Sequence, residues 1–289
     1  MKLATIVIAG EQQLAVIVGD RAIPATTFGP TVPATFTSLL AAGQAGLDAL
    51  RTAAAGARAS SGTRLDDVEF APPVTAPGKI VAIGLNYRAH AQETASVPPA
   101  SPLMFAKFPT SMIGHRTPIR WDPGLTRQVD YEAELGVVIG RRARRVSADA
   151  ALSFVFGYTC INDVSARDLQ AADGQWVRAK SLDTFCPIGP MVVTADEIPD
   201  PQDLDIACYL NGERVQHAST RDMLFDAAAL IAACSAAFTL EPGDIIATGT
   251  PSGIGVARVP QRFLGVGDEV VIEIEGVGRL VNTCLPDPV

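Results

Sequence analysis

From Lys79 onward the chain consists of short apolar runs of strand length, separated by glycine, proline and asparagine. These runs are residues 80–84, 133–139, 154–160, 191–193, 204–210, 244–248 and 269–274. Helical patterns are few, at residues 87–93, 164–170 and 223–238. Because helices do not alternate regularly with the strands, the pattern argues against a doubly wound sheet. It favours an α+β, β-rich architecture, a roll or a sandwich.

The first part of the chain has a different pattern. Residues 1–20 alternate like two strands around a short turn, and residues 35–57 form a helical stretch rich in alanine and leucine. The proline-bearing segment 71–78 then interrupts the chain. We therefore expect a small N-terminal α+β domain at residues 1–75 and a larger domain at residues 76–289.

Charge and composition narrow the classes of partner. The 23 basic and 31 acidic residues give a net charge of −8, the wrong sign for a broad nucleic-acid surface. The longest apolar stretch, residues 227–240, is too short to span a bilayer, and residues 1–20 lack a signal-peptide cleavage pattern. The 5 cysteines include no C-x-x-C pair, which argues against a thiolate zinc site. These features predict a cytoplasmic protein that binds neither nucleic acid nor membrane.

The strand-like segment Asp130-Tyr131-Glu132-Ala133-Glu134-Leu135 carries two carboxylates two residues apart. Successive side chains of a strand point to opposite faces, so Glu132 and Glu134 lie side by side. Adjacent carboxylates repel unless positive charge lies between them. A hard divalent cation, Mg²⁺, Mn²⁺ or Ca²⁺, is the partner that oxygen ligands prefer. The alternative is an ordinary strand that binds no metal.

A third carboxylate, Asp163, follows the apolar strand at residues 154–160. It joins the same candidate site, or it is simply the N-cap of the helix expected at 164–170. Arg167 and Gln170 lie about one turn further along and would project near the same end, where they could meet an anionic substrate.

An acid/base pair is suggested by His90 and Glu93, which share one face of a short helix. Glu93 would fix the tautomer of the imidazole and raise its basicity, as a general base requires. The alternative is a surface ion pair.

Two further segments could bind an anion. Lys180 lies in a weakly charged, loop-like stretch, and the glycine-rich turn 248–255 could present backbone N–H groups. The turn lacks the order of a P-loop or a dinucleotide fingerprint. Neither a G-x-S-x-G elbow nor an H-E-x-x-H motif is present, which removes the usual serine hydrolase and zincin hypotheses.

Taken in order, six motifs resemble the fumarylacetoacetate hydrolase family. They are Gly84-Leu85-Asn86-Tyr87-Arg88-Ala89-His90, Phe105-Ala106-Lys107-Phe108-Pro109, Asp130-Tyr131-Glu132-Ala133-Glu134-Leu135, Asn162-Asp163-Val164-Ser165-Ala166-Arg167-Asp168-Leu169-Gln170, Lys180-Ser181-Leu182-Asp183-Thr184-Phe185 and Thr248-Gly249-Thr250-Pro251-Ser252-Gly253. The resemblance covers about residues 77–286.

That resemblance implies a mixed β-roll catalytic domain, a homodimer, and Mg²⁺ or Mn²⁺ held by Glu132, Glu134 and Asp163. The eponymous hydrolase has a fourth carboxylate seven residues before its histidine, where this chain has Ile83. The chain is therefore similar to the three-carboxylate branch of acylpyruvases, oxaloacetate decarboxylases and hydroxymuconate isomerases.

By the same resemblance, the substrate is a small 2-oxo acid of the acylpyruvate or fumarylpyruvate type. His90, oriented by Glu93, would activate the water that cleaves its carbon–carbon bond. Lys180 and Gln170 are expected to stabilise the oxyanion. Residues expected to bind the substrate are Arg167, Lys107 and Thr250. Oxaloacetate decarboxylation and 5-carboxymethyl-2-hydroxymuconate isomerisation are alternatives at the same site, and a non-catalytic metal-binding scaffold is a third.

Overall fold

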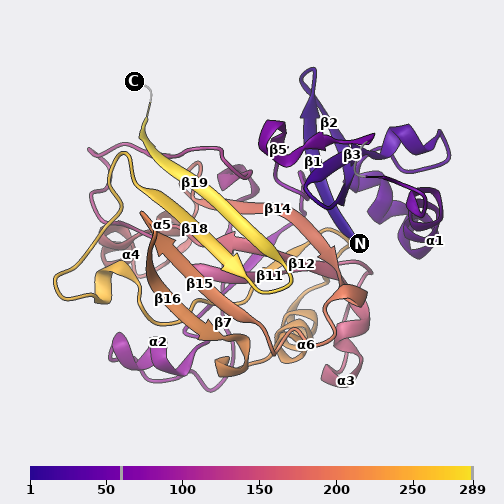
Figure 1. Cartoon of the computed structure of the whole chain (residues 1–289). Helices are drawn as coiled ribbons and strands as arrows, with labels where there is room; N and C mark the ends of the chain where they lie inside the picture. The colour runs from indigo at the N-terminus through magenta and orange to yellow at the C-terminus, as the bar shows by residue number, and fades with distance from the viewer. Residues whose placement is uncertain (59–60, 288–289) are drawn as a thin grey trace.

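The computed structural model describes residues 1–58 and 61–287 and is built around a twelve-stranded mixed sheet (Figure 1). Its hydrogen-bonded order is β4-β3-β2-β1-β14-β12-β11-β17-β6-β7, with β5 beside β1 and β8 beside β14. The strands are β1 (Lys2–Ile8), β2 (Glu11–Val18), β3 (Arg21–Pro24), β4 (Thr63–Arg64), β5 (Glu69–Ala71), β6 (Ile80–Gly84), β7 (Leu103–Lys107), β8 (Met112–Ile113), β11 (Ala133–Ile139), β12 (Val155–Asn162), β14 (Cys186–Thr194) and β17 (Ile245–Ala247).

A second, five-stranded sheet of order β16-β15-β18-β19-β9 lies across the first, as the orange and yellow strands of Figure 1 show. A two-stranded ribbon of β10 and β13 completes the strands. The bounds are β9 (Ile119–Trp121), β10 (Val129–Asp130), β13 (Ser165–Ala166), β15 (Asp205–Leu210), β16 (Glu213–Ser219), β18 (Glu269–Ile274) and β19 (Gly278–Pro286). The expected α+β, β-rich class is confirmed.

The apolar core fills both faces of β11. Leu135 and Val137 belong to the cluster shared with Ile272 of the second sheet. Val138, on the opposite face, packs in a second cluster that includes Leu39 of helix α1 (Phe36–Ala54). A strand covered on both faces reads as a continuous apolar run, which explains its sequence.

The remaining helices of the described chain are short: α2 (Arg88–Glu93), α3 (Ala148–Ala151), α4 (Arg167–Asp173), α5 (Val177–Lys180) and α6 (Ala227–Ala237). The helix expected at 164–170 begins later, because Ser165 and Ala166 pair with β10 instead. The helix expected at 223–238 begins after Asp226, whose side chain accepts a hydrogen bond from the Ala229 N–H and caps it. No helix in the described ranges has the length and hydropathy needed to cross a membrane.

The N-terminal strands continue the main sheet. Strand β1 pairs with β14, with Lys2 opposite Val193 and Leu3 opposite Val192. Helix α1 follows in sequence and begins with a capping box between Thr35 and Ser38. The division at residue 75 stays a prediction, and β1 couples the two segments through backbone hydrogen bonds.

Candidate active site

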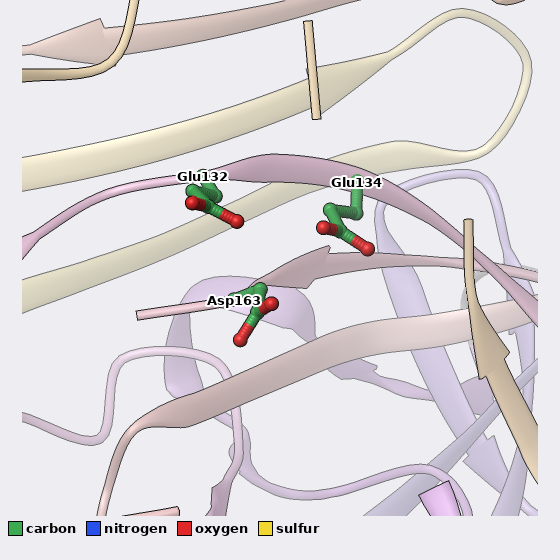
Figure 2. Close-up of side chains that lie close together, drawn as sticks. All are labelled: Glu132, Glu134 and Asp163. Atoms are coloured by element: carbon green, nitrogen blue, oxygen red, sulfur yellow. The ribbon is translucent and has the colours of Figure 1, made fainter. Parts of the chain in front are cut away.

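Three buried carboxylates converge where β11 begins and β12 ends (Figure 2). Glu132 immediately precedes β11, Glu134 lies within it, and Asp163 follows β12. Antiparallel pairing of Ala133 with Asn162 brings these chain ends together, and the Asp163 N–H donates to the Glu132 carbonyl at 2.9 Å. One oxygen of each carboxylate lies within 4.8 Å of the others.

The side-by-side placement of Glu132 and Glu134 follows the predicted strand period. Both lie on the face opposite Leu135, which packs toward the second sheet. Asp163 does not cap a helix, since α4 begins at Arg167. The alternative role for Asp163 is therefore not observed.

The three carboxylates differ in electrostatic environment. Burial raises the pKa of Glu132, but the charges of Lys180, Arg167 and His90 outweigh burial and lower it to about 2. Burial raises the pKa of Glu134 well above its usual range, and the charges of Asp163 and Glu132 raise it further. In the described chain Glu134 has no ion-pair partner.

Cationic side chains surround the other two carboxylates. Lys180 Nζ lies 2.7 Å from Glu132 Oε2 and 2.8 Å from Asp163 Oδ2. Arg167 Nη2 lies 2.7 Å from Glu132 Oε1. Lys107 Nζ lies 2.6 Å from Asp163 Oδ1. The positive charge is thus concentrated on Glu132 and Asp163 and leaves Glu134 uncompensated.

The donor set fits a hard divalent cation. All three groups offer carboxylate oxygens, they are buried together, and burial and the neighbouring carboxylates disfavour the charged form of Glu134 unless a cation is bound. Positive charge bound between the three would remove the repulsion that raises the pKa of Glu134. Glu132, Glu134 and Asp163 are therefore the residues that would hold a divalent cation.

An acid/base pair of the buried His90 and the partly buried Glu93 lies beside the triad. His90 Nδ1 lies 2.9 Å from Glu93 Oε1, and His90 is only 6% exposed. Glu93 Oε2 accepts a hydrogen bond from the Gly253 N–H at 2.8 Å. In the tautomer whose Nδ1–H donates a hydrogen bond to this carboxylate, the imidazole keeps Nε2 as its free basic nitrogen.

A cavity of about 380 Å³ unites most of the predicted site. The predicted residues that line it are His90, Glu132, Arg167, Gln170, Lys180 and Thr250. Its remaining wall is largely apolar and includes Ile83, Phe105 and Trp176. Figure 2 shows Glu134 and Asp163 near Glu132; neither is among the lining residues.

Lys107 differs from its expected position. Its ammonium contacts Asp163, the Lys180 carbonyl and the Val164 carbonyl behind the triad, and the side chain is buried without lining the cavity. Thr250 lines the cavity, and its Oγ1 accepts a hydrogen bond from Gln216 Nε2 at 2.9 Å. Lys107 therefore touches a carboxylate of the triad, whereas the other two residues expected to bind substrate reach the cavity.

The glycine-rich turn presents its N–H groups to anions, and those anions belong to the protein. Gly249 N–H donates to Glu134 Oε2 at 2.9 Å, and Gly253 N–H donates to Glu93. Both glycines have positive φ, 99° and 105°, which other residues rarely adopt. The same loop binds Asp130 through Gly255 N–H at 2.7 Å. Asp130 is missed by the sequence argument, although it lies in the same motif as the paired glutamates.

The fold and the carboxylate site define the class of protein. Residues 79–285 match the family model described as "Fumarylacetoacetate (FAA) hydrolase C-terminal". The chain belongs to the fumarylacetoacetate hydrolase family, as its motifs predict.

Individual relatives differ in the reactions that their names state. Human oxaloacetate tautomerase FAHD2A, mitochondrial, is 43% identical over 266 residues, which cover 91% of this chain and 84% of that protein. The 5-carboxymethyl-2-hydroxymuconate delta-isomerase of Mycobacterium smegmatis is 35% identical with a TM-score of 0.78, over 99% of this chain and 100% of the other. Maleylpyruvate hydrolase from Sphingobium sp. SYK-6, in complex with manganese(II) and pyruvate, is 32% identical with a TM-score of 0.81, over 100% of both chains. All three are enzymes. The cytoplasmic expectation stays a prediction, since one relative is named as mitochondrial.

Proposed function

We propose that this protein is a divalent-metal-dependent enzyme that interconverts the keto and enol forms of oxaloacetate. The observation that carries the proposal is that His90, paired with Glu93, lines the same cavity as Glu132 of the triad. Tautomerisation moves a proton between C3 and the 2-oxygen of the substrate, so a single well-placed base suffices. It needs neither an attacking water nor a leaving group.

The proton transfer is assigned to His90. With Nδ1 bonded to Glu93, the imidazole takes the C3 proton at Nε2, and the resulting cation is stabilised by the Glu93 carboxylate. The imidazolium then returns a proton to the 2-oxygen, which completes the enol with no net change at the enzyme. Glu93 is itself held by Gly253, so the ring has a fixed orientation.

Positive charge in the cavity stabilises the negative 2-oxygen of the enolate. A bound divalent cation supplies a Lewis acid to the 2-oxo acid. The Lys180 ammonium, held beside Glu132 and Asp163, adds a second positive group at the cavity wall. Arg167 and Gln170 line the same cavity, and we assign the binding of a substrate carboxylate to them.

Carbon–carbon bond hydrolysis, the first reading of the sequence, is the second candidate. The same His90 could activate a water molecule, and the Sphingobium maleylpyruvate hydrolase supports this candidate by fold and sequence. The alternatives are oxaloacetate decarboxylation and hydroxymuconate isomerisation; the mammalian tautomerases, at 42–43% identity, support the substrate of the first and the reaction class of the second. Tautomerisation of oxaloacetate combines those two alternatives.

The test is the rate at which the purified enzyme equilibrates enol and keto oxaloacetate, followed by the ultraviolet absorbance of the enol. Mn²⁺ or Mg²⁺ and EDTA are compared, and pyruvate release from oxaloacetate, acylpyruvates and maleylpyruvate is measured in parallel. Metal-dependent equilibration without pyruvate release supports the tautomerase. Metal-dependent release of pyruvate from an acylpyruvate or maleylpyruvate, with no effect on enol decay, would replace it with the hydrolase.

A further inference from the structure

Asp130 is a fully buried carboxylate whose two oxygens are saturated with hydrogen bonds. Oδ1 accepts from the N–H groups of Tyr131 at 2.9 Å and Gly255 at 2.7 Å. Oδ2 accepts from the Val256 N–H at 3.0 Å and from Arg167 Nε at 2.9 Å. Asp130 is not among the residues that line the cavity. Asp130 is therefore not in a position to contact a substrate in the cavity directly.

Arg167 is the residue through which Asp130 can reach the cavity. Its guanidinium donates from Nε to Asp130 and from Nη1 to Gln170 Oε1 at 3.0 Å. Nη2 lies 2.7 Å from Glu132 Oε1 as an ion pair, but it has no hydrogen-bond partner among the described residues. Because Arg167 lines the cavity and Nη2 is a buried donor without an acceptor, this donor points to a ligand in the cavity.

We propose that Asp130 is a positioning residue, which fixes the plane of the Arg167 guanidinium so that its free N–H groups bind a substrate carboxylate. This inference rests on the proposed function in that the cavity takes a 2-oxo acid. Without the Asp130 charge, Glu132, already 2.7 Å from Nη2, is left as the one carboxylate partner of the guanidinium in the described chain, and it draws further N–H groups toward itself. The Arg167 N–H groups that a substrate carboxylate needs would then contact Glu132 instead.

The glycine-rich turn makes this arrangement rigid. A Cβ on Gly255 would lie 2.6 Å from Asp130 Oδ1 and 2.0 Å from the Arg262 carbonyl oxygen, so only glycine allows this approach. The neighbouring Ile254 and Val256 line the cavity. Asp130 thus joins the cavity wall to the arginine, which keeps both in one geometry.

The experiment uses Asp130→Asn, which keeps the volume and removes the charge. The dissociation constant of oxalate, a planar dicarboxylate that resembles a pyruvate enolate, is measured by calorimetry with Mn²⁺ present. KM and kcat for oxaloacetate are measured on the same samples. In Asp130→Asn we expect the dissociation constant of oxalate and the KM for oxaloacetate each to rise at least tenfold. The kcat should change less than threefold. In an Arg167→Met background, the same substitution is expected to change oxalate binding less than twofold.

The matched control is Asp244→Asn. Asp244 is also fully buried, pairs with Lys79, and accepts the N–H groups of Lys79 and Glu241, but it is not among the residues that line the cavity. Its loss should lower the melting temperature and leave oxalate binding unchanged. An equal loss of oxalate binding from Asp130→Asn in both backgrounds, or none at all, overturns the proposal. If Arg167→Met does not fold, the positioning role is judged from oxalate binding alone, which must weaken in Asp130→Asn and stay unchanged in Asp244→Asn.

The two levels of inference fail separately. A wild-type enzyme that leaves oxaloacetate untouched, yet binds oxalate in an Asp130-dependent way, rejects the tautomerase and keeps the positioning role. If the wild type turns over oxaloacetate normally, but Asp130→Asn leaves oxalate binding unchanged, the tautomerase is kept and the positioning role is rejected.

Discussion

Glu93 joins two segments of the site: its Oε1 lies 2.9 Å from His90 Nδ1, while its Oε2 accepts the Gly253 N–H at 2.8 Å. A flexible surface ion pair would lack the second contact. The carboxylate is therefore a fixed partner of the imidazole, and the glycine-rich turn is what fixes it.

Replacing His90 by asparagine should lower kcat for oxaloacetate tautomerisation by roughly a hundredfold or more, since general-base catalysis contributes that much. Glu93→Gln keeps a hydrogen bond and should lose less. Enol decay in stopped-flow measurements gives both values. The control is the affinity for Mn²⁺, measured by calorimetry, which should stay within about threefold of the wild type in both variants. A His90 variant with full activity would contradict the assignment of His90 as the base.

Glu134→Gln is expected to matter mainly when metal is bound. Without metal, burial and the charges of Asp163 and Glu132 raise the pKa of Glu134 and favour its neutral form, which glutamine resembles, so the melting temperature should stay close to that of the wild type. With Mn²⁺ present, the variant should lose most of the metal-induced rise that the wild type shows. Differential scanning calorimetry with EDTA or MnCl₂ measures both.

The control for that experiment is Glu273→Gln, which removes an exposed ion pair with Arg279 at 2.8 Å. Surface pairs contribute little, so both melting temperatures should match the wild type. A Glu134 variant that keeps the full metal-induced rise would exclude Glu134 as a ligand.

The lowered pKa of His115 predicts that the free energy of unfolding decreases in mild acid. Its Nδ1 accepts the Val281 N–H at 3.0 Å, and burial, with Arg116 and Arg279, lowers its pKa from 6.5 to about 4. Between these values the unfolded chain binds more protons than the folded one, so stability rises with pH and falls as the pH drops from 6.5 toward 4. The loss at pH 5 is on the order of 1 to 2 kcal/mol.

Urea unfolding at pH 7 and pH 5 tests this sign. His115→Gln lacks the titrating ring, so its stability should fall less than that of the wild type over the same interval. Subtracting the two chains cancels the contribution of the acidic residues, which both share. A wild-type loss no larger than that of His115→Gln would contradict the prediction.

The position of Trp176 in the cavity wall requires a glycine at residue 84, because a side chain there would overlap the indole ring. Trp176 packs edge-on against Phe105 with ring centroids 5.3 Å apart, and a Cβ on Gly84 would lie 2.5 Å from its ring. Gly84→Ala should therefore displace the indole, shift its fluorescence and raise KM for oxaloacetate severalfold. Gly56→Ala, where a Cβ meets nothing within 4 Å, is the matched control.

Trp121→Phe provides the background for the fluorescence measurement, because the chain has 2 tryptophans. An unchanged emission spectrum and KM in Gly84→Ala would show that Trp176 does not depend on this contact.

Sequence reasoning reached most of the site because its signals are local. The strand period placed Glu132 and Glu134 on one face, and spacing along a helix paired His90 with Glu93. The bounds of β6, β11 and β18 match the predicted ones; β6 and β11 are buried along their whole length. The Asn211-Gly212 turn, a dipeptide favoured in tight hairpins, joins β15 and β16.

Only the tertiary structure decided which distant groups meet. Lys107 faces Asp163 behind the triad, Asp130 holds Arg167, and the turn at residues 249–255 serves three carboxylates of the protein itself. These partners lie far apart in the chain, and their approach depends on sheet register and loop packing, which no local pattern encodes. The sequence by itself determined which chemical groups the site contains and which strand face carries the glutamates, because backbone geometry repeats every two residues. Their partners, charges and access to the cavity follow from the fold.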